Sequence, residues 1–147
     1  MELNKPVGKW ILGIHKHNEK FISERLKDYN LNRSQSSILI YLYNNGDGIN
    51  QEELTSEMGV DKSTISRGIK SLIKGGYIFK KRSQDDKRVY LIYLSDNGNK
   101  LRNLIKDTYR EWFSIIMEGI PEEEVDIILK NLEILFNKIK DDEFKIL

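Results

Sequence analysis

Two short helical patterns separated by a three-residue turn constrain the fold of this chain more than any other feature. The first pattern covers residues 51–57 and follows Asn50, which stands in a capping-box pattern. A MetGlyVal turn comes next, and Asp61 can cap a second helix that runs to Gly75. Two short helices joined by a turn that contains glycine are typical of a helix-turn-helix.

The residues after this motif change from a helical to a strand periodicity. Residues 77–82 and 89–94 have the composition and the two-residue period of strands. The segment SQDDKR at 83–88 connects them and is unusually rich in charge. The pattern predicts a β-hairpin whose tip carries two acids and two bases. By itself, this tip could simply be a polar, soluble turn.

Helical patterns surround this central unit on both sides. Apolar residues recur with a helical period over residues 5–29, and Asn32 begins a second helix with another capping-box pattern. After the hairpin, Ser95 can cap a long helix, and Pro121 stands at the start of the last one. The sequence therefore predicts one mostly α-helical domain with a single small hairpin, in keeping with its 147 residues.

The charge of the chain is balanced overall but distributed unevenly. The net charge is +1, yet residues 62–88 carry nine lysines and arginines against two aspartates, which gives +7. Residues 118–147 carry nine acids against four bases, which gives −5. A local basic surface on a nearly neutral chain indicates a polyanionic partner, although a solvated basic face gives the same pattern.

The helix that begins after Asp61 has two chemically different sides. At about 100° per residue, its apolar side chains fall on one arc, and these are Ile65, Ile69, Leu72 and Ile73. The opposite side has three cations and three hydroxyls, and these are Ser63, Thr64, Arg67, Lys70, Ser71 and Lys74. Because a solvated helix usually mixes charges of both signs, this side favours contacts with phosphates and base edges. Gly68 interrupts the helix, and we expect it to allow close packing on the preceding helix of the motif.

The order of these elements and several motifs resemble the MarR (multiple antibiotic resistance regulator) family of bacterial and archaeal transcription factors. The resemblance covers nearly the whole chain. YNLNRSQ at 29–35 resembles the start of the family's second helix, and QEELTSEMGV at 51–60 resembles the helix before the recognition helix. DKSTISRGIKSLIKGGYI at 61–78 matches the recognition helix, and DDKR at 85–88 matches the family's Asp-x-Arg wing.

The resemblance implies a winged helix-turn-helix flanked by dimerisation helices. Within the single domain of residues 1–147, it assigns residues 31–95 to DNA binding, and residues 5–29 and 96–140 to dimerisation. It implies a homodimer that regulates transcription as a repressor or an activator, of which we expect the repressor. Such a dimer would read a pseudo-palindromic operator in double-stranded DNA, with half-sites about 34 Å apart.

The resemblance also gives the charged hairpin tip a function. It implies that the wing reaches the minor groove and that Arg88 enters it, since narrow A·T-rich grooves attract arginine. An acid beside DNA would repel phosphate, so we expect Asp86 to orient an arginine of the wing or of the recognition helix through a charge-assisted hydrogen bond. The predicted contacts on the wing are Lys81, Arg82, Asp86, Lys87 and Arg88.

Family members often release DNA when a small aromatic or anionic ligand binds between the dimerisation helices and the winged part. The resemblance implies such an effector here, and six side chains could line its site: Trp10, Ile14, Tyr29, Tyr43, Trp112 and Phe113. Aromatic residues at helical spacing are equally consistent with an ordinary core. His15 and His17 point to opposite sides of a helix and cannot share one ion, and the chain has no cysteine, so we expect no metal and no cofactor.

Two other classes of function compete with this interpretation. A winged helix can serve protein interaction without specific operator binding, but the polar side of residues 61–75 lacks the aromatic anchors of such surfaces. An enzyme is not expected, because we find no glycine-rich phosphate loop and no nucleophile with a histidine. The first residues contain no apolar run long enough for a signal peptide or a membrane span, so we expect a cytoplasmic protein. The operator, the regulated genes and the effector cannot be deduced from these residues.

Overall fold

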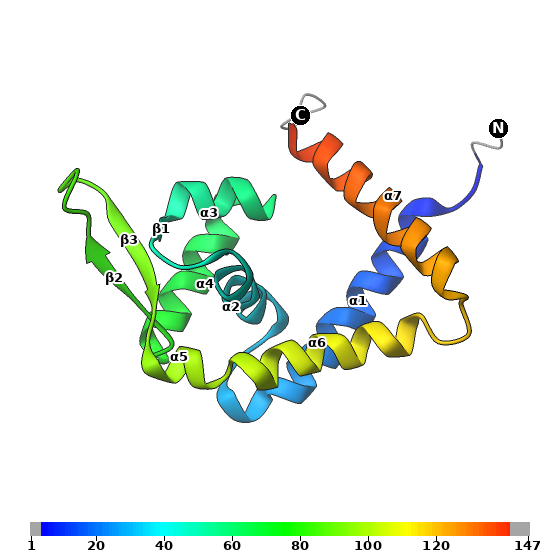
Figure 1. The fold of residues 1–147 in the computed structure, drawn as a ribbon, viewed down its shortest axis with the longest axis horizontal. Helices are drawn as coiled ribbons and strands as arrows, with labels where there is room; N and C mark the ends of the chain where they lie inside the picture. Colours follow the sequence, from blue (N-terminus) through cyan, green and yellow to red (C-terminus); the bar gives the residue numbers. More distant parts are fainter. Residues whose placement is uncertain (1–3, 142–147) are drawn as a thin grey trace.

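A computed structural model describes residues 4–141, and its elements follow the predicted order (Figure 1). The helices of this region are α1 (Val7–Leu26), α2 (Arg33–Asn45), α3 (Gln51–Met58), α4 (Lys62–Lys74), α5 (Asp96–Lys100), α6 (Arg102–Ile116) and α7 (Glu122–Asp141). The strands are β1 (Ile49–Asn50), β2 (Ile78–Arg82) and β3 (Tyr90–Leu94). The predicted fold class is therefore confirmed: the chain is mostly α-helical with a small β-hairpin wing.

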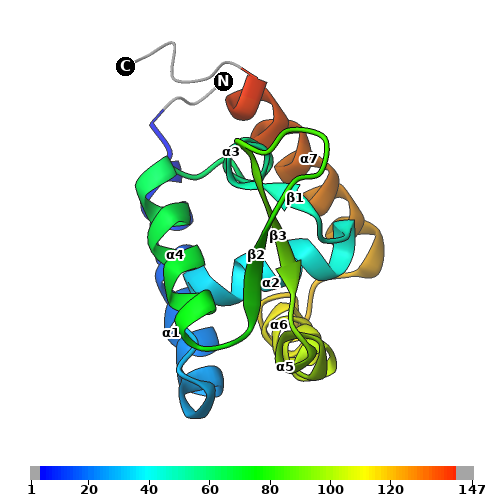
Figure 2. The same cartoon turned by 90° about the vertical axis from the view of Figure 1, so that its left-hand side faces the viewer.

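The three strands form one antiparallel sheet in the order β1-β3-β2. In the hairpin, Ile78 pairs with Leu94 at the base, and Arg82 pairs with Tyr90 toward the tip. β1 pairs only two residues with β3. Figure 2 shows the hairpin crossing in front of α2, with α4 beside it on the same face of the molecule.

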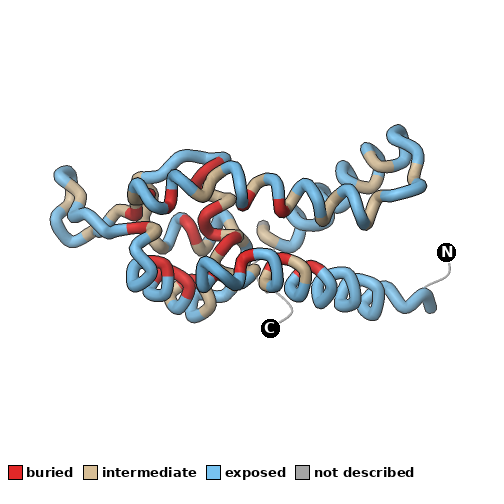
Figure 3. The backbone as a smooth tube through the Cα atoms, turned by 90° about the horizontal axis from the view of Figure 1, so that it is seen from below, coloured by how far each residue is buried: buried red, intermediate tan, exposed pale blue. Residues whose placement is uncertain are grey.

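One hydrophobic core holds the winged part together. It is formed by side chains from α1, α2, α3, α4, the two hairpin strands and α6, among them Leu26, Leu39, Leu54, Leu72 and Ile92. Figure 3 shows that the buried segments gather in this part, whereas the N-terminal half of α1 and most of α7 are exposed. The core thus fixes α4 and the wing relative to each other.

Local hydrogen bonds begin the helices where the sequence predicts them. Asn32 and Gln35 form a complete capping box at α2. Asn50 accepts a hydrogen bond from the backbone N–H of Glu53 at 2.8 Å, but the reciprocal bond of a full box is not recorded at α3. Ser95 accepts from the backbone N–H of Gly98 at 3.1 Å and begins α5. These caps satisfy helix N–H groups that would otherwise lack a partner.

Two predicted helices need corrected boundaries, and one short strand was missed. The first helix ends at Leu26, and a 3₁₀ turn (Lys27–Tyr29) continues it to Asn30, which has a φ of 55°. The helix after Ser95 is not continuous, because α5 ends at Lys100 and α6 begins at Arg102, with Leu101 between them. Strand β1 was not predicted at all. It is only two residues long, and its existence depends on pairing with β3, which no local pattern reveals.

Candidate nucleic-acid interface

Helix α4 presents the predicted polar face to solvent. Asp61 caps the helix by accepting from the backbone N–H of Thr64 at 3.0 Å. Ile65, Ile69 and Leu72 are buried, so they hold the helix against the core. Of the six predicted polar residues, Thr64 is partly exposed and the others are exposed: Ser63, Arg67, Lys70, Ser71 and Lys74. Ile73 belongs to the same apolar arc but is 38% exposed near the end of the helix.

Gly68 lies on the buried side of α4 and packs against α2. A Cβ atom at this position would lie 2.6 Å from Cδ1 of Ile38. The expectation that Gly68 would allow close packing on the preceding helix of the motif, α3, is therefore wrong. The contact is with α2, because α4 crosses that helix closely, and the helical period alone does not identify the partner.

The tip of the wing is held by its own side chains. Ser83 Oγ accepts from the backbone N–H groups of Asp85 and Asp86 at 3.2 and 3.4 Å. Asp86 Oδ1 accepts from Nε of Arg88 at 3.1 Å, and Oδ2 accepts from Nη2 at 3.2 Å. The side-chain and then the backbone hydrogen bonds of Arg88 hold the pKa of Asp86 below its usual value. The predicted hydrogen bond between Asp86 and a wing arginine is thus confirmed.

Arg88 is oriented but remains accessible. Its side chain is 90% exposed, whereas that of Asp86 is 43% exposed. The two-point contact fixes the plane of the guanidinium group, and the edge of the group that does not face Asp86 is free for another acceptor. Lys81, Arg82 and Lys87 are exposed on the same hairpin.

A pair on the wing was missed by the sequence analysis. Nη2 of Arg82 donates to the hydroxyl of Tyr90 at 2.7 Å, and the guanidinium carbon lies 5.3 Å from the centre of the Tyr90 ring. The two residues are directly opposite in the register of β2 and β3. This pairing could have been predicted from the hairpin pattern, because residues 82 and 90 stand at equal distances from the tip and are therefore opposite each other.

The six residues predicted to line an effector site come from α1, the 3₁₀ turn, α2 and α6. Trp10 and Ile14 are exposed on α1, and Nε1 of Trp112 donates to Nδ1 of His17 at 3.1 Å. Tyr29 is exposed, and Phe113 is partly exposed. Whether any of the six touches a ligand remains a prediction.

Tyr43 differs from the other five because it is part of the core of the winged part. Its hydroxyl donates to the backbone oxygen of Gly98 at 2.6 Å, and the guanidinium carbon of Arg102 lies 4.9 Å from the ring centre. Burial raises the pKa of Tyr43 to about 12. These contacts connect α2 to the α5–α6 junction.

Two cavities adjoin these helices. The larger, of about 910 Å³, lies between the helix-turn-helix and the end of α7, where Lys140 contacts Glu57 at 3.1 Å. The smaller, of about 480 Å³, lies between α1 and the start of α2, and Lys20 and Arg33 are among its lining residues. Neither cavity is lined by any of the six predicted residues.

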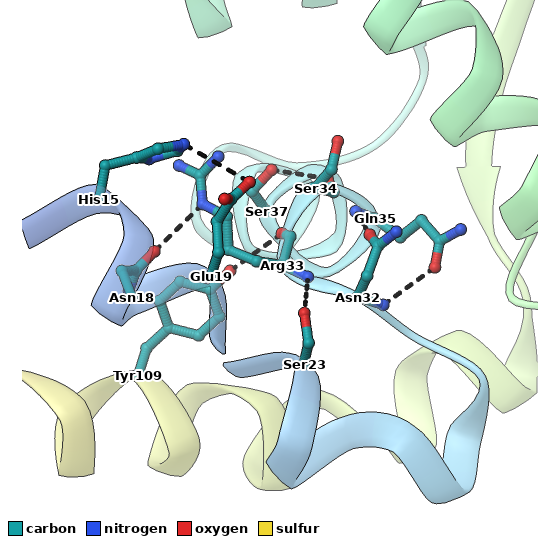
Figure 4. A network of polar contacts seen from close by, with 10 residues as sticks. All are labelled: His15, Asn18, Glu19, Ser23, Asn32, Arg33, Ser34, Gln35, Ser37 and Tyr109. Carbon is teal, nitrogen blue, oxygen red and sulfur yellow. Dashed lines mark hydrogen bonds and ion pairs between the residues drawn. The ribbon is translucent and has the colours of Figure 1, made fainter. Parts of the chain in front are cut away.

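Arg33 connects α2 to α1 beside the smaller cavity (Figure 4). Its Nε donates to Oδ1 of the buried Asn18 at 3.1 Å, and its backbone N–H donates to Oγ of Ser23 at 3.2 Å. The hydroxyl of Tyr109 on α6 lies 2.8 Å from Oγ of Ser36, one turn further along α2. Within residues 4–141, the Nη atoms of Arg33 have no recorded hydrogen-bond partner.

The histidines do not form a metal site in the described part of the chain. Nε2 of His15 lies 3.5 Å from Glu19, and His17 contacts Trp112. Over residues 4–141, no group of three or more His, Cys, Asp or Glu side chains could hold a metal ion. No helix in the same range is long and apolar enough to cross a membrane.

The exposed basic helix and the adjacent wing define a winged helix-turn-helix protein of the DNA-binding class. The family model described as transcriptional regulator SarA/Rot matches residues 20–105. A MarR transcriptional regulator from Methanosarcina mazei Go1 is 32% identical, with a TM-score of 0.82, and the match covers 90% of this chain and 94% of that one. The chain belongs to the MarR family of transcriptional regulators, and its relatives are regulators rather than enzymes.

Two further relatives support this assignment. The HTH-type transcriptional regulator BilQ of Clostridioides difficile (strain CD3) is 26% identical over 125 residues, which is 85% of this chain and 84% of the relative. A putative MarR family regulator from Listeria monocytogenes, solved in complex with a 26mer DNA, is 27% identical with a TM-score of 0.84. That match covers 94% of this chain and 91% of the other.

Proposed function

We propose that this chain is a homodimeric repressor that binds a pseudo-palindromic operator through α4 and the wing. The observation that carries the proposal is the exposed face of α4, which has three cations, three hydroxyls and no acid, next to a wing that presents an oriented arginine. The residues proposed to contact DNA are Ser63, Thr64, Arg67, Lys70, Ser71, Lys74, Lys81, Arg82, Asp86, Lys87 and Arg88. Arginine and lysine neutralise phosphates, and arginine also suits a narrow minor groove.

Exposed apolar side chains on α1 and α7 support the homodimer. On α1, Val7, Trp10, Ile11, Leu12 and Ile14 are between 50% and 59% exposed. On α7, seven apolar residues between Ile127 and Ile139 are between 43% and 69% exposed. Helical faces of this kind require a partner surface, and a second copy offers the same two faces by symmetry. We therefore assign residues 31–95 to DNA binding, and residues 5–29 and 96–140 to dimerisation.

The junction of α1 and α2 supports release by a small anionic or aromatic ligand. The cavity of about 480 Å³ lies where the helical part meets the winged part, and its lining includes the cations Lys20 and Arg33 together with the acids Glu19 and Glu24. A carboxylate that binds Arg33 through both Nε and Nη2 would displace the hydrogen bond of 3.1 Å from Nε to Asn18. Loss of that bond would loosen α1 against α2 and change the position of α4 relative to a second copy.

Binding to DNA from just upstream of the protein's own gene tests the proposal. The native fragment and a scrambled fragment of equal length and composition are compared at two salt concentrations. We expect a preference for the native fragment that survives moderate salt, because base contacts do not depend on counterion release as phosphate contacts do. Equal binding to both fragments that disappears with salt would contradict specific recognition and would favour the winged-helix protein-interaction module.

A substitution on the wing separates DNA contact from folding. We expect Arg88→Ala to weaken binding to the native fragment by about ten-fold or more, with an unchanged melting temperature, since the side chain is almost fully exposed. Arg110→Ala is the matched control, because Arg110 is an exposed arginine on α6 paired with Asp107 at 2.7 Å, away from the wing. If the wild type and the Arg88 variant bind the native fragment with equal affinity, Arg88 of the wing is not part of the DNA interface.

A further inference from the structure

The N-terminus of α4 has a hydrogen-bond arrangement that involves more than capping. Asp61 Oδ2 accepts from Oγ of Ser63 at 2.5 Å and from the backbone N–H of Thr64 at 3.0 Å. Asp61 Oδ1 accepts from Oγ1 of Thr64 at 2.6 Å. One carboxylate thus binds both hydroxyls at the exposed start of the helix that carries the basic face.

These bonds determine the direction of both hydroxyl hydrogens. An ionised carboxylate only accepts hydrogen bonds, so Ser63 and Thr64 must each donate to it. The hydroxyls of Ser63 and Thr64, followed by the backbone N–H of Thr64, hold the pKa of Asp61 well below its usual range. Asp61 therefore stays ionised at any pH at which the protein works, and both hydrogens remain directed inward.

Outward, the same two hydroxyls present only lone pairs. A hydroxyl has one hydrogen and two acceptor positions, and the hydrogen is already engaged by Asp61. Nη2 of Arg67, which lies 3.4 Å from Oγ1 of Thr64, approaches one such lone pair as a donor. A phosphate oxygen cannot bond to either hydroxyl while Asp61 holds it, because a phosphate diester offers acceptors only.

The negative charge of Asp61 also disfavours a phosphate beside these hydroxyls. An uncapped helix N-terminus attracts phosphate through its free N–H groups and its dipole. At α4, the cap carries a carboxylate and the exposed Lys62 follows it, whereas Arg67, Lys70 and Lys74 lie further along the helix. A phosphate near the start of α4 would therefore bind Lys62 and not the hydroxyls of Ser63 and Thr64.

We propose that Asp61 determines specificity by holding Ser63 and Thr64 as hydrogen-bond acceptors for the amino groups of adenine and cytosine in the major groove. Adenine N6 and cytosine N4 are the base-edge donors of that groove, whereas guanine and thymine present acceptors there. This inference rests on the proposed function, since it assigns base recognition to one part of that interface. Asp61 acts through its neighbours and is a positioning residue.

Selection from a random double-stranded DNA library tests the assignment without knowledge of the operator. Wild type, Asp61→Asn and Ser63→Ala are each incubated with the library, and the bound DNA is sequenced. An asparagine caps a helix as well as an aspartate does, but its amide nitrogen donates a hydrogen bond. It would therefore reverse one of the two hydroxyls, which would then present its hydrogen outward.

We expect the wild type to enrich a two-fold motif with adenine or cytosine at one position of each half-site. In Asp61→Asn, the preference at that position should move toward guanine or thymine by about ten-fold, with the other positions unchanged. Ser63→Ala should reduce the preference at the same position without reversing it. Asn50→Asp is the control, because it exchanges asparagine and aspartate at the cap of α3 instead of α4. It should change the overall affinity for DNA but not the preferred base.

The outcomes separate the inference from the proposed function. If the wild type enriches no motif, the result would contradict the proposed specific operator binding and, with it, the role of Asp61. A wild-type motif that both variants reproduce at every position, with melting temperatures retained, would overturn the role of Asp61 alone. Ser63→Ala leaves the cap intact, so this comparison remains decisive if Asp61→Asn does not fold.

Discussion

The winged part and the outer helices use their apolar residues in opposite ways. In the winged part, helix periodicity and strand pairing place Leu39, Ile69 and Ile92 in a closed core, where each is fully buried. In α7, Leu132 and Leu135 repeat at helical spacing with similar regularity, yet they are 52% and 54% exposed. The same sequence signal thus produces a finished core in one region and an open face in the other. The difference supports the proposal that a second chain completes the outer helices.

The largest expected effect comes from placing a charge on the open face of α7. We expect Leu132→Glu to abolish the dimer and to weaken operator binding by about a hundred-fold or more, because two linked recognition helices bind far more tightly than one. Asn131→Glu introduces the same side chain at the adjacent exposed position and should leave both properties unchanged. Size-exclusion chromatography with light scattering measures the mass. A Leu132 variant that remains a dimer would contradict the assignment of this face.

The core of the winged part should respond through stability instead. We expect Ile69→Ala to lower the free energy of unfolding by about 2–5 kcal/mol, since the side chain is fully buried. Ile73→Ala is the same exchange one turn later in α4, at a side chain that is 38% exposed, and should cost about 1 kcal/mol or less. Urea denaturation at fixed protein concentration measures both. Equal losses would show that the two positions do not differ in burial.

A smaller effect is expected where α4 crosses α2. Gly68→Ala gains about 1 kcal/mol of helix propensity but introduces a Cβ atom 2.6 Å from Ile38, an overlap that costs about 1–3 kcal/mol in a packed core. We expect a net destabilisation of about 1 kcal/mol. Ser71→Ala, on the exposed side of the same helix, should not destabilise. A stabilised Gly68 variant would mean that Ile38 moves aside without cost.

Features governed by neighbouring residues could be predicted from the sequence. The caps at Asn32, Asn50, Asp61 and Ser95 each involve a side chain and a backbone N–H three residues later, so residue type and spacing suffice. The sequence predicted that Asp86 binds an arginine of the wing or of the recognition helix, and the structure identifies this arginine as Arg88, two residues away. The chemistry of the α4 face follows from helical geometry alone, and five of its six polar residues are exposed.

Features that depend on contacts between distant segments could not be predicted in this way. The partner of Gly68, the exposure of Ile73 and the existence of β1 depend on how α2, α4 and β3 are placed. The six aromatic and apolar residues proposed for an effector were grouped by character, and neither of the two cavities is lined by any of them. Lys20 and Arg33, which line the cavity between α1 and α2, gave no local signal because they come from two helices.

The number of chains bound to one operator tests the central claim most directly, because it joins the two regions in one measurement. Native mass spectrometry of the wild type mixed with a duplex that carries its selected motif gives this number. We predict two chains per duplex at every protein concentration that gives binding, with no complex of one chain. A specific complex that contains a single chain would show that the winged part acts alone and that the open faces of α1 and α7 have another partner.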